Sequence, residues 1–141
     1  MSDHELQLAR ERSHQDAKTT NDNGRAAAQA AILINGGAAT AILALASKEH
    51  PPSAAVLAAV PYALGVYAFG VVFGALMMFC MILSVQRWTI VWEGRVRNYP
   101  APTIDRVRRH ARGWAIASRV CFVFAVLCFA AGSIVIARGL S

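Results

Sequence analysis

The sequence predicts an all-α integral membrane protein with three transmembrane helices, a polar N-terminal arm and a basic cytoplasmic helical hairpin. The 141-residue chain is 56% hydrophobic and 16% charged, whereas roughly a quarter of a soluble domain is charged. Its apolar residues fall into three blocks, each at least as long as the roughly 20 residues that cross a bilayer. Its charges lie almost entirely between those blocks. These observations exclude a disordered chain and an ordinary soluble enzyme.

The polar arm covers residues 1–24, ahead of the first apolar run. A secretory signal places its apolar stretch directly after a short basic start, so we expect the first span to serve as its own insertion signal. Ser2–Glu5 fits a capping box that starts a short polar helix, and Asn21–Gly24 fits a break before the first span. A segment this polar buries too little apolar surface to order itself. A solvated tail is therefore favoured over the alternative, a docking arm for a partner.

The three spans are predicted from the lengths of their uncharged stretches. The first covers residues 25–47. The second block, 54–85, is uncharged and longer than one upright helix requires. Because proline suits the first helical turn and not the interior, the span itself is placed at 61–86. The complete division of the chain is 1–24 arm, 25–47 first span, 48–60 external connection with an interfacial segment, 61–86 second span, 87–113 basic hairpin, 114–137 third span and 138–141 external tail.

The basic residues predict the orientation, since cytoplasmic loops near spans are enriched in Lys and Arg. Residues 87–113 carry seven arginines and the first 25 residues carry four basic side chains. The opposite side has only Lys48 and Arg138. Arginine outnumbers lysine and alanine is abundant, which is typical of a GC-rich bacterial genome. We therefore expect a multi-pass bacterial inner-membrane protein with a cytoplasmic N-terminus and an external C-terminus.

Aromatic residues mark the two membrane boundaries, because Trp and Tyr prefer the headgroup level. Trp88, Trp92 and Trp114 fall at the cytoplasmic boundary, and Tyr62 and Tyr67 fall toward the outer one. Trp88 and Trp92 are four residues apart and so share a helical face. The second helix is therefore expected to continue out of the bilayer beyond the end of its span.

The basic hairpin is expected to turn at residues 98–102, where two prolines interrupt the helix. Thr103 is expected to cap the following helix, with Asp105 in its first turn. Basic charge beside spans is explained first by topology and by attraction to anionic headgroups, second by a protein partner, and nucleic acid is not expected. The residues predicted to contact headgroups or a partner are Arg95, Arg97, Arg106, Arg108, Arg109, Arg112 and Arg119.

Small residues at helical spacing predict the faces through which the spans pack, because they let helix backbones approach closely. The second span carries a GxxxG pattern, and the third carries a stripe of small residues seven apart. Packing within the chain and packing between chains both fit, so a homo-oligomer or a membrane-protein partner is expected. The predicted packing residues are Gly37, Ala41, Gly70, Gly74, Cys121, Ala125, Cys128 and Gly132.

Few polar residues lie inside the spans, where such groups usually mark a site. Asn35, followed by two glycines, is predicted to be a structural clamp between helices, or alternatively to line a pore. Arg119 is shallow enough to reach the cytoplasmic headgroups with its long side chain. The spans contain no Asp or Glu, which argues against a proton-coupled carrier. Their lack of histidine argues against a membrane cytochrome.

We expect this protein to function by binding other membrane helices rather than by catalysing a reaction. No catalytic, cofactor-binding or metal-binding residues are predicted. The sequence favours a non-enzymatic accessory subunit or scaffold of a membrane complex. The alternative is a homo-oligomeric channel or membrane-disrupting effector in which Asn35 lines the pore.

Overall fold

The computed structural model describes residues 3–47, 53–97 and 99–140, and this part of the chain is helical apart from its short connections. Each helix contains a stretch long and apolar enough to cross a membrane. The three spans predicted from hydropathy are thus confirmed as three helices of spanning length. Their bounds are α1 Asp3–Ala46, α2 Ala54–Val96 and α3 Ala101–Leu140.

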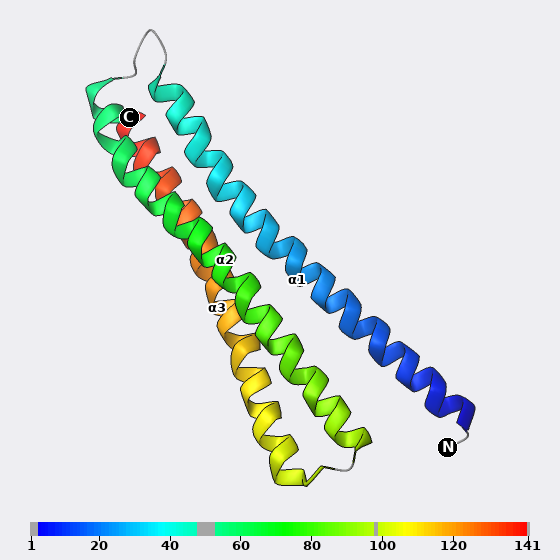
Figure 1. Ribbon diagram of the computed structural model, residues 1–141. Coiled ribbons are helices and arrows are strands. Elements are labelled where there is room, and N and C mark those ends of the chain that lie inside the picture. Colours follow the sequence, from blue (N-terminus) through cyan, green and yellow to red (C-terminus); the bar gives the residue numbers. More distant parts are fainter. Residues whose placement is uncertain (1–2, 48–52, 98, 141) are drawn as a thin grey trace.

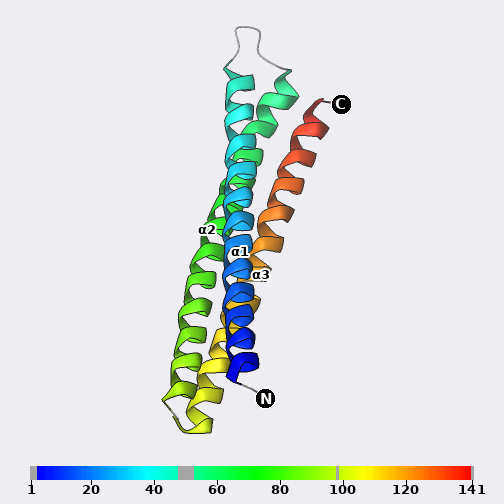
Figure 2. The same ribbon diagram turned by 90° about the vertical axis from the view of Figure 1, so that its right-hand side faces the viewer.

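The three helices run up, down and up, so that each is antiparallel to the next along the chain (Figures 1 and 2). α2 and α3 form a long hairpin, and α1 packs against α2. The N-terminal part of α1 stands apart from the hairpin in Figure 1. α2 is therefore the central element, with a neighbour on each side.

The helices pack because small or apolar side chains recur along one face of each, at steps that average close to three and a half residues. This period keeps one face toward the partner when helices supercoil in a left-handed sense. The buried residues in register are Ala28, Ala31, Asn35 and Ile42 of α1; Val56, Val60, Ala63, Tyr67, Gly70, Gly74, Met77, Ser84 and Val91 of α2; and Ala111, Ser118, Ala125 and Gly132 of α3.

α1 passes without interruption through residues 21–24, so the break expected there is wrong. Weak helix formers cost at most about 1 kcal/mol each inside a helix, which continued backbone hydrogen bonding offsets. Gly24 also lies against the Met81 side chain of α2, where a Cβ would collide with it. The small residue thus serves helix contact rather than a turn. Ser2, the first residue of the expected capping box, lies outside the described residues.

α2 extends beyond its predicted span at both ends. α2 continues to Val96, as the tryptophan spacing predicted. It begins at Ala54, where Ser53 caps it by accepting a hydrogen bond of 3.4 Å from the Val56 N–H. Pro61 lies inside this helix, so the interfacial segment expected before it is helical and continuous with the second span.

α3 begins three residues earlier than expected, which makes the assignment of Thr103 as its cap wrong. The Pro100 carbonyl accepts hydrogen bonds from the Thr103 and Ile104 N–H groups, at 3.0 and 3.3 Å. Pro102 lies in the first turn, where its missing N–H leaves no bond unmade. The first residue of the expected turn, Asn98, lies outside the described residues.

The packing of α3 on α2 yields a stability prediction at Gly132. A Cβ there would lie 2.7 Å from the Tyr67 ring, which is buried and held by neighbours, so Gly132→Ala is expected to lower the free energy of unfolding by about 1–3 kcal/mol. The measurement is equilibrium unfolding in mixed detergent micelles. Gly65→Ala is the matched control, because nothing lies within 4 Å of its Cβ position. Equal effects of the two substitutions would contradict the packing described.

Candidate functional site

Three helices meet at one level around Asn35 of α1. Its side chain is 1% exposed, and its Nδ2 donates hydrogen bonds to the carbonyls of Ala31, at 2.8 Å, and Ala125, at 3.3 Å. The first carbonyl belongs to α1 itself and the second to α3. On the α2 side, the Cβ position of Gly70 overlaps the Asn35 amide. The Asn35 side chain thus joins α1 to α3 while filling space that only a glycine on α2 leaves open.

The Asn35 Oδ1 is buried and has no conventional hydrogen-bond donor among the described residues. It is the atom nearest to the Cβ position of Gly70, and in glycine a second α-hydrogen points in that direction. The arrangement is that of a Cα–H···O contact, which recurs between closely packed helices. Asn35 therefore lies within the bundle of a single chain, in the manner of a structural clamp.

The GxxxG pattern of α2 faces α1 of the same chain. One turn along from Gly70, a Cβ on Gly74 would lie 2.8 Å from Ile32 Cγ1 and 3.5 Å from the Ala28 carbonyl oxygen. Both glycines are buried. The pattern thus provides close approach of α1 and α2, and this face of α2 is covered by its own chain.

The residues of the small-residue stripe of α3 differ in how deeply they are buried. Ala125 and Gly132 are buried, whereas Cys121 and Cys128 are partly exposed. Gly132 leaves room for the Tyr67 ring of α2. The stripe therefore marks the side of α3 that contacts the other two helices.

Tyr67, which the sequence placed toward the outer membrane boundary, faces the interior of the bundle rather than its surface. It is 3% exposed, its OH is 3.1 Å from Ser133 Oγ, and its ring packs against Phe129. Tyr62 is 74% exposed, as the boundary assignment requires. The signal that sequence reasoning missed is register, because Tyr67 is four residues after Ala63 and therefore on the inner face of α2.

Ser84 is a second polar contact that sequence reasoning missed. Its hydroxyl is buried and donates to the Ala111 carbonyl of α3 at 3.0 Å. Ser84 is two heptads after Gly70, which places it on the inner face. A serine in a span can equally bond to its own helix, as Ser133 does with the Phe129 carbonyl at 2.9 Å, so spacing alone did not identify an interhelical bond.

α1 carries a second small-residue face that points away from the bundle. Gly37 and Ala41 are exposed, and nothing lies within 4 Å of the Cβ position of Gly37. Leu33 and Leu43 flank this face and are 72% and 54% exposed. These two predicted packing residues are therefore not used inside the chain.

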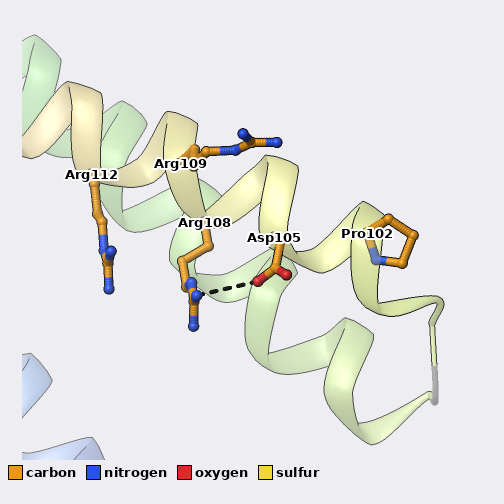
Figure 3. Close-up of a pocket in the computed structure, with 5 residues that line it drawn as sticks. All are labelled: Pro102, Asp105, Arg108, Arg109 and Arg112. Atoms are coloured by element: carbon orange, nitrogen blue, oxygen red, sulfur yellow. Dashed lines mark ion pairs between the residues drawn. The ribbon is translucent and has the colours of Figure 1, made fainter.

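The predicted headgroup or partner contacts lie on exposed or partly exposed positions, and all except Arg119 are toward the end of the bundle that carries the turn between α2 and α3. Arg108 forms an ion pair of 3.3 Å with Asp105, and the Arg95 guanidinium lies 5.2 Å from the centre of the Trp92 ring. Figure 3 shows Arg108 and Arg112 projecting to one side of α3 and Arg109 to another. With Pro102 and Asp105, these three arginines line a shallow surface hollow. The remaining predicted contacts, all exposed, are Arg97, Arg106 and Arg119.

Comparison of the chain with protein families, curated proteins and solved structures gave no match. Within the described residues, no three His, Cys, Asp or Glu side chains come together as a metal-ligand group. The structure alone therefore supplies the candidate sites. They are the buried junction at Asn35, the exposed small-residue face of α1 and the basic region of α3.

The clamp at Asn35 predicts energetic coupling between two positions. Gly70→Ala is expected to lower the free energy of unfolding by about 1–3 kcal/mol, and Asn35→Ala by about 1 kcal/mol. In the double variant the Cβ at position 70 enters space that the amide has vacated, so the loss is expected to be well below the sum. The measurement is a double-mutant cycle from unfolding in mixed micelles.

Asn35→Ala combined with Gly65→Ala provides the control cycle, which is expected to be additive because the two sites share no contact. Additive behaviour of the Asn35 and Gly70 pair would show that the amide does not occupy the space left by Gly70.

Proposed function

We propose that this chain is a non-enzymatic, three-span membrane protein that acts by helix assembly, as an accessory subunit or scaffold of a membrane complex. The observation that carries the proposal is the division of the small residues of α1 between two faces. One face, with Ala28 and Ala31, is buried against the bundle. The other, with Gly37, Ala41 and Ala44, is exposed within an apolar span.

The exposed face is suited to another helix, because lipid chains gain little from small residues whereas a helix backbone can approach them closely. Gly37 and Ala41 are four residues apart, which is the spacing at which Gly70 and Gly74 contact α1 within the chain. The same device that holds α1 to α2 is thus repeated on the outer side of α1. A second copy of the chain or a span of another membrane protein is the proposed occupant.

The proposed location is the bacterial inner membrane, with the N-terminus in the cytoplasm and the C-terminus outside. The excess of arginine at the turn between α2 and α3 supports this orientation. The exposed pair Trp92 and Trp114 supports a membrane boundary at the same end. In this orientation the basic end of the hairpin meets the anionic headgroups of the cytoplasmic leaflet.

The assembly proposal predicts that bulk on the outer face of α1 weakens association. The double variant Gly37→Leu, Ala41→Leu is expected to raise the dissociation constant of the complex roughly tenfold or more, equivalent to about 1.4 kcal/mol. The measurement is energy transfer between labelled chains in liposomes over a range of protein-to-lipid ratios, together with native mass spectrometry after gentle detergent extraction. Gly65→Leu, on an exposed face of α2, is the matched control.

If the wild-type chain is monomeric in liposomes and extracts without any bound membrane protein, the assembly proposal fails. If Gly65→Leu weakens association as much as the α1 variant, the interface lies elsewhere.

The orientation is tested by a reporter placed at two positions. A phosphatase that is active only outside the cytoplasm is expected to be active when fused after Ser141 and inactive when inserted at Asn98. A fluorescent protein that folds only in the cytoplasm is expected to give the opposite pattern. Activity of the phosphatase at Asn98 would reverse the proposed orientation.

A further inference from the structure

The exposed face of α3 carries two arginines at different depths. Arg112 and Arg119 are seven residues apart, which is close to two helical turns and roughly 10.5 Å along the axis. Both side chains are exposed. Continuing along the same face, Ile116, Val123 and Val126 are 60%, 54% and 48% exposed. One exposed face of α3 therefore carries two basic side chains toward the start of the helix and apolar side chains beside and beyond them.

Arg119 lies inside the apolar stretch of α3, five residues or roughly 7.5 Å beyond Trp114. A guanidinium at this depth is costly in hydrocarbon and orients its long side chain toward the interface. That direction leads along the helix to Arg112. In the described part of the chain, neither Arg112 nor Arg119 has an ion pair or a hydrogen bond, so their charge calls for an anion from outside the described bundle.

The spans of a second copy of this chain hold no carboxylate at the depth of Arg119. No Asp or Glu occurs in residues 23–48, 54–92 or 106–141. Asp105 lies four turns further out along α3 and is already paired with Arg108. The anion that every phospholipid bilayer offers at the interface toward which the Arg119 side chain extends is the lipid phosphate, located just outside the acyl chains.

We propose that α3 holds an anionic phospholipid, with its phosphate between the guanidinium groups of Arg112 and Arg119 and an acyl chain along Ile116, Val123 and Val126. Guanidinium groups bind phosphate oxygens through paired, charge-assisted hydrogen bonds. Two adjacent arginines favour a lipid of net negative charge, because the cationic group of a zwitterionic lipid would be brought close to them. The site is distinct from the outer face of α1 and does not depend on the assembly proposal.

The test compares single arginine-to-glutamine variants of the full-length protein in detergent micelles. Phosphatidylglycerol is titrated into the protein and the lipid-bound fraction is measured by native mass spectrometry, with phosphatidylcholine of the same acyl chains as the second probe. Arg119→Gln and Arg112→Gln are each expected to weaken phosphatidylglycerol binding roughly tenfold, the loss of a charge-assisted contact. Arg119→Lys is expected to recover part of the affinity.

Arg106→Gln is the matched control. It removes the same charge from a different face of the same helix, where Arg106 contributes general attraction to headgroups but is not part of the proposed site. It is expected to leave phosphatidylglycerol binding within a factor of about two, as general electrostatics predicts for an exposed charge. The unfolding transition of each variant, recorded in parallel, separates lost binding from lost structure.

Three results would overturn the proposal. Equal losses for Arg106→Gln and Arg119→Gln would show that lipid binding follows total charge rather than a site. Phosphatidylcholine binding as tightly as phosphatidylglycerol would remove the selectivity for anionic lipid. Unchanged lipid binding combined with loss of a copurifying membrane protein in Arg119→Gln would assign this face of α3 to a partner's carboxylate.

Discussion

The amide of Asn35 sets the constraint on which the rest of the bundle depends, because a polar side chain in hydrocarbon has to find its partners within the protein. Its Nδ2 reaches the Ala125 carbonyl of α3, and it fits only because Gly70 of α2 has no side chain. The three helices are thereby fixed in register at one level. Gly74 and Gly132 then follow as the neighbouring positions at which the same register demands a glycine.

Much of this fold could be predicted from the sequence, since the information is local. Hydropathy identified the three spans, and the spacing of Gly70 and Gly74 identified a packing face, because both depend on side-chain type and period alone. The direction of each face could not be predicted in the same way. Gly37 has the same spacing relative to Ala41 and yet points outward, since the choice between two small-residue faces of α1 depends on which one accommodates the Asn35 amide.

Tyr67 and residues 21–24 are two places where local sequence preferences predicted the wrong structure. A tyrosine near a span end is typical of a membrane boundary, but the cavity that Gly132 leaves on α3 draws the Tyr67 ring inward and Ser133 accommodates its hydroxyl. An Asn-Asp-Asn-Gly segment is typical of a helix break, but Gly24 packs against Met81 within a continuous helix. In both cases a contact between distant segments overrides a local preference.

The register also fixes the depths at which the two proposed surfaces lie. Ala125, level with Asn35, is eleven residues beyond Trp114, or roughly 16 Å along the helix. With the membrane boundary at Trp114, as proposed, the clamp would lie near the centre of a hydrocarbon layer roughly 30 Å thick. Gly37 and Ala41 continue from this level toward the opposite boundary, whereas Arg119 stays close to the Trp114 boundary. A lipid phosphate on α3 and a helix on the outer face of α1 would therefore occupy different depths and different sides of the bundle. Binding of one would leave the other surface open, so the proposed lipid at α3 and the proposed partner helix at α1 would lie in opposite halves of the membrane.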